Sequence, residues 1–431
     1  MHSMHRAPTA WVWAVATCLL WVGDAVAADR AAWYREARQA NPSVQAARDA
    51  WRAAHAEVDA AGRLPDPVVT YGHFVQSVET RVGPQQQQVG VRQTLPWFGS
   101  LERRRAVARS GAEAERARAV DTWLAVRAEL DVALNAVHRI DGALAIEEEG
   151  FALLEQFEGV ARARLRVDAG GSADVLRIQV ELARADDRVR ALRQRRDPAV
   201  ARVNALLDRA LDAPLGATPE LPVHVAPASL DSLERRVLAH HPALGAVAIE
   251  QRRQERRAAV AADTGKPAFT VGLVHTFVGE RGVEGLDDDG RDATLATLSV
   301  NVPLWRGRVD AAVQGARERQ ARWRSVERAT RNDLLAELRD AVFELDDADR
   351  RVALHRDTLV PKAEESLRAQ LDAYANARTD FGALIDVQRT LLDLQRGLLD
   401  ARVDRADARA RLDRLAPTAS AVDPTLLEVS R

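Results

Sequence analysis

The residues best suited to bind a metal ion are the acidic run Asp287-Asp288-Asp289-Gly290 with Asp292, and the pair His240-His241. Calcium prefers carboxylate oxygens, but the acidic run lacks the spacing and the final glutamate of an EF-hand loop. We therefore interpret the run as a solvated loop. Adjacent side chains on a helix point apart, and His241-Pro242 stands where a helix would begin, so we expect these histidines to have a structural role.

A third candidate, Thr264-Gly265-Lys266-Pro267, superficially resembles a phosphate-binding loop. It lacks the upstream glycine, and it lies where a helix passes into a strand, which is the reverse of the required order. No Ser/His/Asp set and no pair of carboxylates stands out from the evenly spread charges. The sequence therefore predicts no enzyme activity, no catalytic residue, no metal site and no cofactor.

Charge and composition favour long helices and exclude one class of partner. The 431 residues include 61 Lys and Arg against 63 Asp and Glu, and aromatic residues make up only 5%. Basic and acidic residues alternate along the chain, so it lacks the basic surface that a nucleic-acid-binding protein needs. The abundance of Ala, Arg, Leu and Glu is typical of long helices.

The first 27 residues have the anatomy of a secretory signal peptide. Arg6 precedes an apolar run from Trp11 to Gly23, and Ala25-Val26-Ala27 provides small residues for cleavage after Ala27. The alternative is an N-terminal membrane anchor, although the run is shorter than the roughly 20 residues of a spanning helix. The only cysteine, Cys18, lies in this run; it could be a lipid attachment site, but its neighbours favour an ordinary signal residue.

Both methionines, Met1 and Met4, also precede the predicted cleavage site, so the mature chain would contain no sulfur. Such a chain can form no disulfide and offers no soft thiolate or thioether ligand.

The rest of the chain contains two halves that resemble one another. Asn41-Pro42 recurs as His241-Pro242, and Leu165 to Gln179 aligns with Tyr374 to Gln388. We divide the chain into a first repeat at residues 28–210, a proline-rich linker at 211–230, a second repeat at 231–416 and a C-terminal tail at 417–431.

Each repeat contains a helical hairpin, at about 100–210 and about 308–415. In the first, apolar residues recur every three or four positions: Trp123, Val126, Leu130, Ala133, Val137, Ile140 and Leu144. This is the pattern of a coiled coil, and a helix from Ser100 to about Asp168 would be on the order of 100 Å long. Gly170-Gly171 would stop it and Ser172 would cap the returning helix. An ordinary four-helix bundle is the alternative.

Two alternating segments in each repeat predict strands, at about 67–76, 87–96, 267–278 and 293–303. Each has one apolar and one mostly small or polar face, and each has the length with which a tilted strand crosses a bilayer. A strand in lipid must have both edges paired, and four strands cannot close a barrel. The chain must therefore associate, giving eight, twelve or more strands.

Six motifs lie along these segments: Asn41-Pro42, Leu64-Pro65-Asp66-Pro67, Gln93-Thr94-Leu95-Pro96-Trp97-Phe98-Gly99, Ala173-Asp174-Val175-Leu176, Ala373-Tyr374 and Asp386-Val387-Gln388-Arg389-Thr390-Leu391. Together these motifs resemble those of a known family, the TolC-like outer-membrane factors or outer membrane efflux proteins. The resemblance implies a mainly helical fold with a small β part, in which each repeat contributes two transmembrane strands. It also implies a homotrimer, with a twelve-stranded barrel in the lipid of the outer membrane and a helical barrel in the periplasm.

The resemblance implies partners and places several segments. An inner-membrane pump of the resistance-nodulation-division (RND) type would act through a periplasmic adaptor protein. The linker would lie at the family's equatorial girdle, and residues 77–86 and 279–292 would be extracellular loops. The aromatic residues expected at the membrane interface are Tyr71, Trp97, Phe98 and Trp305.

Acidic residues near the periplasmic tip narrow the entrance in this family and favour cations. The candidates here for the tip or gate are Asp168, Gly170, Gly171, Ser172, Asp174, Asn376, Asp380 and Asp386. Ala383 replaces a second aspartate that some members carry three residues before the position of Asp386. A solvated residue at a helix start is the alternative for Asp174 and Asp386.

The motifs look most like the heavy-metal cation branch of the family, which predicts divalent heavy-metal cargo. The alternatives are a drug or type I secretion duct of the same fold, and, from another class, a soluble periplasmic coiled-coil scaffold.

Overall fold

The computed structural model describes residues 30–166, 171–216, 218–222, 225–282, 287–376 and 378–422. The predicted signal peptide with Cys18 and Ala27, the tip candidates Asp168 and Gly170, and residues 423–431 of the tail lie outside the described residues.

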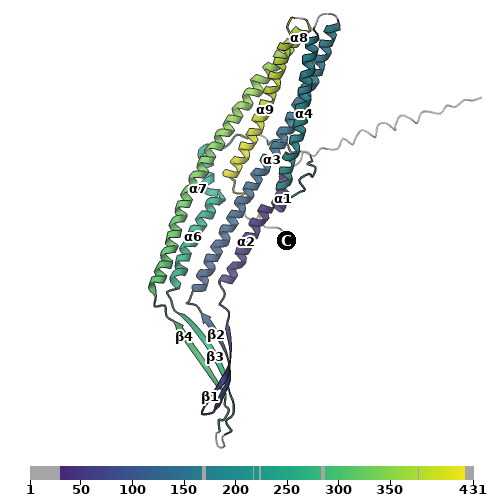
Figure 1. Cartoon of the computed structure of the whole chain (residues 1–431). Coiled ribbons are helices and arrows are strands. Elements are labelled where there is room, and N and C mark those ends of the chain that lie inside the picture. The colour runs from purple at the N-terminus through teal and green to yellow at the C-terminus, as the bar shows by residue number, and fades with distance from the viewer. Residues whose placement is uncertain are drawn as a thin grey trace, which may run out of the picture. The chain divides into compact units, whose positions relative to one another are not determined.

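The described chain is mainly helical and contains one small sheet (Figure 1). The helices of its first half are α1 (Arg30–Ala40), α2 (Pro42–Ala61), α3 (Ser100–Arg166) and α4 (Ser172–Leu206). Those of its second half are α5 (Leu230–His240), α6 (Pro242–Asp263), α7 (Arg306–Leu354), the π-helix η1 (His355–Leu359), α8 (Val360–Ala375) and α9 (Phe381–Leu415). The strands are β1 (Val68–Thr80), β2 (Gly83–Leu95), β3 (Ala268–Val278) and β4 (Ala293–Asn301).

The chain divides into two compact units, and each combines segments from both halves. The hairpin unit takes its described residues from Met1–Ala37, Val132–His224 and Arg351–Ala406. The sheet unit takes them from Arg38–Asp131, Val225–Arg350 and Asp407–Arg431.

Equivalent helices in the two halves start in the same way. Asn41 caps α2, because its side-chain oxygen accepts hydrogen bonds from the N–H groups of Ser43 at 3.0 Å and Val44 at 3.2 Å. His241 caps α6 by accepting one from Ala243 N–H at 3.3 Å. A proline follows each cap at the first helical position, where its missing N–H costs nothing.

The start of α4 differs from the expectation. Its N-cap is Gly171, with extended backbone angles of φ −95° and ψ 150°, and Ser172 is the first helical residue. Since the cap makes no side-chain hydrogen bond, glycine here allows the turn into the helix without contributing a cap of the serine type.

The four strands form one antiparallel sheet in the order β1-β2-β3-β4, so the two halves meet at the β2–β3 pair. The first hairpin is longer than expected: β1 continues to Thr80 and β2 begins at Gly83, so the expected loop at 77–86 is reduced to Arg81 and Val82. Gly83 has φ +127°, and a Cβ atom there would meet the carbonyl of Gly279, so this turn requires glycine. In the second half β4 ends at Asn301, two residues before the expected end.

Each unit has its own apolar core. In the hairpin unit the largest buried side chains include Phe157, Tyr374 and Phe381, contributed by α3, α8 and α9. In the sheet unit Val237 of α5, Leu338 of α7 and Leu412 of α9 pack together. Five residues of the coiled-coil pattern on α3 are buried, from Trp123 to Val137. Helical periodicity therefore predicted the packing faces of the longest helix correctly.

Candidate functional sites

The sheet has two chemically different faces, and the strand register defines them. Val69 lies opposite Val91, which in turn lies opposite Leu273, and residues directly opposite one another project from the same face. The apolar face formed in this way consists mainly of Val69, Tyr71, Val89, Val91, Leu95, Phe269, Val271, Leu273, Phe277, Leu298 and Val300. Ten of these eleven side chains, all but Phe269, are 36–71% exposed. So much exposed apolar surface on one side of a sheet marks a surface that contacts something other than water.

Small and polar residues dominate the opposite face, although Val274 and Leu295 also project from it. Thr94 and Thr270 lie opposite each other, with their hydroxyl oxygens 3.2 Å apart. Arg92 lies beside Gly272, where an added Cβ atom would come within 2.9 Å of the arginine side chain. Glycine therefore leaves room for a cation on the polar face.

The outer edges of the sheet belong to β1 and β4, which pair only with β2 and β3 respectively among the described residues. Each outer edge therefore presents backbone N–H and C=O groups that another strand could pair with.

Three of the four predicted interface aromatics, Trp97, Phe98 and Trp305, lie at the end of the sheet where it joins the helices. Trp97 follows β2 and stacks on Phe269 of the apolar face, with ring centroids 6.2 Å apart. Phe98 and Trp305 are 80% and 82% exposed. Tyr71 lies within β1 on the apolar face, two residues farther from the helices than Val69.

At the opposite end of the sheet, the acidic loop is held by its own carboxylates. Asp289 accepts hydrogen bonds from the N–H groups of Arg281 and Gly282, each at 2.9 Å. Asp288 forms an ion pair with Arg81 of the β1–β2 turn, and Asp292 accepts a hydrogen bond from Val278 N–H at 3.0 Å. Among the described residues, no group of three or more His, Cys, Asp or Glu side chains is arranged to hold a metal ion.

The hairpin unit brings one tip candidate into contact with a tyrosine far away in the sequence. Tyr374 of α8 is buried, and its hydroxyl lies 3.5 Å from the Asp174 carboxylate at the start of α4. Burial and the nearby Asp174 charge raise the pKa of Tyr374. Arg164 lies over the tyrosine ring at 4.3 Å and donates a hydrogen bond to the Tyr374 carbonyl at 2.8 Å. The sequence motif included Tyr374, but nothing in the sequence singled out Arg164, because the contact joins residues 210 positions apart.

Three further tip candidates that the structure describes, Asn376, Asp380 and Asp386, each make contacts within their own segment. Asn376 ends α8 and donates to the Asp372 carbonyl at 2.8 Å, while Asp380 accepts from Ala383 N–H at 3.0 Å just before α9. Asp386 is exposed on α9, 3.6 Å from Arg389 of its own helix. Asn376 and Asp380 therefore act as helix-end groups, and Asp386 is a carboxylate that is 76% exposed.

A groove of about 390 Å³ lies between α4 and α9 in the same unit. Its apolar lining comes from Leu176, Val180, Phe381 and Ile385, and its charged lining includes Arg177, Glu181, Asp386 and Arg389. Leu176 and Val180 are 62% and 51% exposed, and Arg389 and Glu181 join the two walls at 2.6 Å.

The sequence also gave no indication of a buried carboxylate between three helices of the hairpin unit. Glu147 of α3 is 2% exposed and accepts a hydrogen bond from Arg188 of α4 at 3.0 Å. It also pairs with Arg396 of α9, and burial lowers the pKa of that arginine. In the sequence Glu147 is one of three consecutive glutamates, and only the packing distinguishes it from its neighbours.

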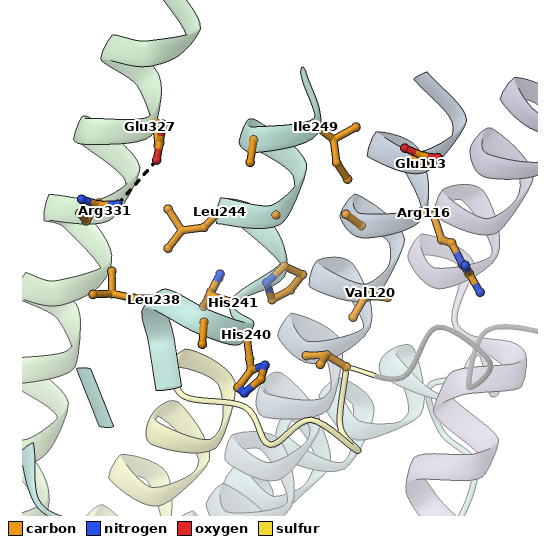
Figure 2. A pocket seen from close by; sticks show the side chains of 16 residues that line it. Glu113, Arg116, Val120, Leu238, His240, His241, Leu244, Ile249, Glu327 and Arg331 are labelled. Atoms are coloured by element: carbon orange, nitrogen blue, oxygen red, sulfur yellow. Dashed lines mark ion pairs between the residues drawn. The ribbon is translucent and has the colours of Figure 1, made fainter. Parts of the chain in front are cut away.

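A pocket of about 500 Å³ in the sheet unit is lined by residues of α3, α6 and α7 and by the corner at His240 and His241 (Figure 2). His241 is 5% exposed, and burial lowers its pKa, so its neutral form is favoured. The cap that it provides to α6 confirms the structural role expected for it. Glu327 and Arg331 of α7 form an ion pair at 3.6 Å on the wall of the pocket.

Among the helices that the structure describes, none combines the length and the apolarity needed to cross a membrane.

Comparison with known proteins supports one family and one fold. Residues 233–417 match the family model described as outer membrane efflux protein. A search of curated proteins finds no match. Among solved structures, that of CusC is similar with a TM-score of 0.74 and 13% identity over 91% of this chain and 93% of CusC. The outer membrane protein VceC from Vibrio cholerae gives 0.72 and 15% over 90% of this chain and 95% of VceC. The CmeC outer membrane channel of Campylobacter jejuni gives 0.74 and 10% over 90% of this chain and 85% of CmeC.

These likenesses confirm the fold class predicted from the sequence, since the chain shares the fold of solved outer-membrane channels along nine-tenths of its length. They do not separate the branches of the family, because channels with several different names match equally well.

Proposed function

We propose that the chain is one protomer of a homotrimeric outer-membrane efflux channel, a passive exit duct of the TolC-like type. The observation that carries this proposal is the four-stranded sheet, with one apolar face, one mostly polar face and two open edges. The efflux-family match over residues 233–417 supports it independently.

The apolar face suits contact with lipid. Its strands are 9 to 13 residues long, which reaches or exceeds the 9 to 11 or so that a tilted strand needs to cross a bilayer. In lipid the edge groups of β1 and β4 would each cost several kcal/mol if they were unpaired. Pairing β4 of one copy with β1 of the next satisfies both edges, and three copies give the twelve strands of a closed barrel.

The polar face would then line the passage. Its threonines and glycines leave space near the axis, and Arg92 beside Gly272 would contribute one cation per protomer. A water-filled lumen accepts such residues readily, while a lipid-facing surface does not.

The groove between α4 and α9 is the surface that we assign to the periplasmic adaptor, which would connect the duct to an inner-membrane RND pump. Its exposed Leu176 and Val180, bordered by the Glu181–Arg389 ion pair, suit an amphipathic helix with an apolar stripe and charged flanks. The duct contains no energy source in this proposal, and the pump supplies it.

We further propose divalent heavy-metal cations as the cargo. The motifs around Leu64 to Pro67 and Pro96 to Gly99 support this assignment, as does a mature chain without cysteine or methionine, which would pass soft ions on without retaining them. Asp386 would then attract cations at the entrance.

Three measurements on the mature chain test the channel proposal. We expect detergent to be required for extraction, a mass of three protomers, and single-channel conductance in planar bilayers. A monomer that is extracted without detergent and forms no pore would instead support a periplasmic coiled-coil scaffold.

A matched pair of variants tests the entrance. Asp386 and Asp393 lie on the same helix, are 76% and 74% exposed, and each lies near an arginine three residues on. We expect Asp386→Ala to lower the preference of the pore for cations, while Asp393→Ala leaves it unchanged and trimer yield stays equal. Equal selectivity in the two variants would exclude Asp386 from the entrance. For the cargo, a wild-type pore whose conductance does not respond to divalent metal ions, with drug export observed in cells, would assign the chain to the drug branch instead.

A further inference from the structure

A recess of about 450 Å³ lies where the sheet joins the helices of the sheet unit. Its walls are the first turns of α3 and α7, the last turn of α6 and the adjoining strand ends. Its lining includes Trp97, Arg104, Asp263, Lys266, Trp305 and Arg308.

The recess carries an excess of positive charge. Arg104, Lys266 and Arg308 line it from three different elements, and Arg104 and Arg308 are exposed. Asp263 is the one carboxylate in its lining, and its side chain is only 7% exposed. That carboxylate is already occupied, because Arg103 donates to it at 2.9 Å and Lys266 lies 2.9 Å away. An anion in the recess would therefore meet cations and little repulsion.

The recess lies at the end of the sheet and borders both of its faces, since Ala268 and Asn301 pair on the polar face and Trp97 lies beside the apolar one. Trp97 lines it and stacks on Phe269, which belongs to that face. Trp305 closes the α7 side and is 82% exposed. A ligand that fits both surfaces must have a negatively charged group joined to a long apolar body. Indole rings at the boundary between them are typical of a membrane interface.

We propose that this recess binds the phosphate headgroup of an anionic phospholipid, with the acyl chains lying along the apolar face. The inference rests on the proposed function, because only a sheet that crosses the outer membrane brings this junction to the level of the headgroups on the periplasmic side. The lysine and two arginines supply donors to the phosphate oxygens, and the tryptophans contact the glycerol region and the first methylene groups.

The test is native mass spectrometry of the intact mature protein in detergent, titrated with phosphatidylglycerol or with phosphatidylcholine. The variant is Arg104→Gln with Arg308→Gln. The control is Arg109→Gln with Arg317→Gln, which removes two exposed cations from the same helices outside the recess. Each cation at an anionic lipid surface strengthens binding about fivefold, so we expect the recess variant to bind phosphatidylglycerol about 25-fold more weakly. The control variant should bind it as the wild type does.

Two results would overturn the proposal while leaving the channel intact. The first is equal binding of phosphatidylglycerol and phosphatidylcholine by the wild type. The second is an equal loss of phosphatidylglycerol binding in the recess variant and the control variant. In both cases the trimer mass and the conductance would be unchanged. The second result would mean that the lipid is held by general charge, or that a neighbouring protomer covers the recess. A chain that neither inserts into bilayers nor forms trimers would remove the proposed function and this site together.

Discussion

Leu298 and Ser299 provide a direct test of the two faces of the sheet, because they are neighbours near the middle of β4 and are both exposed. Leu298 pairs with Val271 on the apolar face, and Ser299 pairs with Thr270 on the polar face. Replacing either residue by arginine introduces the same side chain at almost the same depth. Only the face differs.

The expected magnitudes follow from the solvent that each face would meet. Leu298 lies two residues from the Val300–Phe269 pair, which is beside Trp97 at the expected interface, so an arginine there would lie between the interface and the middle of the bilayer. At that depth arginine on the lipid face costs roughly 1–2 kcal/mol per protomer, or about 3–6 kcal/mol in a trimer. Arginine on the lumen side remains in water and costs little. We expect Leu298→Arg to reduce the trimer recovered from urea-washed outer membranes by about tenfold or more. Ser299→Arg should assemble normally and shift ion selectivity toward anions, because it adds three positive charges to the lumen.

The refuting outcomes are specific. Equal trimer yields from Leu298→Arg and Ser299→Arg would mean that the apolar face does not contact lipid. A larger defect in Ser299→Arg would mean that the two faces are assigned the wrong way round.

Three further expectations concern stability. His241→Asn should make unfolding less sensitive to acid. Burial lowers the pKa of His241 in the folded state, so protonation of its ring destabilises the native state as the pH falls below about 6.5. Asparagine caps the equivalent helix at Asn41 without titrating, and thermal unfolding at pH 5 and pH 8 measures the difference. Glu147→Gln should lower the melting temperature by several degrees, because it leaves Arg188 and Arg396 without their shared buried carboxylate at a cost of about 2 kcal/mol. High salt should not restore the melting temperature of the wild type. Asp263→Asn should lower the free energy of unfolding by about 1 kcal/mol at pH 7. Burial would raise the pKa of Asp263, but hydrogen bonds from Arg103 and Lys266 outweigh it, so the pKa in the folded state is lowered. The difference in stability between variant and wild type should therefore shrink below about pH 4.

The sequence predicted the two faces of the sheet better than the ends of its strands. Apolar and polar residues alternate clearly around Val89 and Val91, so the faces of β2 could be assigned before its partners were known. The polar run from Gln85 to Gln88 shows no alternation, and the strand was therefore expected to start at residue 87. Strand pairing in that part of the sheet depends on backbone hydrogen bonds and on Gly83, which side-chain patterns do not reveal.

The tip could be predicted only in part, because its contacts join distant segments. The break before α4 follows from its glycines, although the cap was expected at Ser172 and lies at Gly171, and the cap at Asp380 is formed by a residue type that favours helix starts. The placement of Arg164 over Tyr374 depends on how α3 and α8 pack, and neither residue carries a local signal of it. The same holds for Glu147, whose burial follows from three helices meeting around it.

The pairing of β2 with β3 shows why neither half of the chain could form this surface alone. Each half contributes a two-stranded ribbon, and a ribbon of that size is marginally stable in water and leaves two edges open. Pairing Val91 with Leu273 joins the apolar faces of both halves into one continuous surface and leaves one open edge from each half. In the proposed trimer the same step would be repeated between chains, because β4 of one copy and β1 of the next come from opposite halves, as β3 and β2 do within a chain. The two repeats of the sequence would therefore supply both of the edges that a closed barrel has to join.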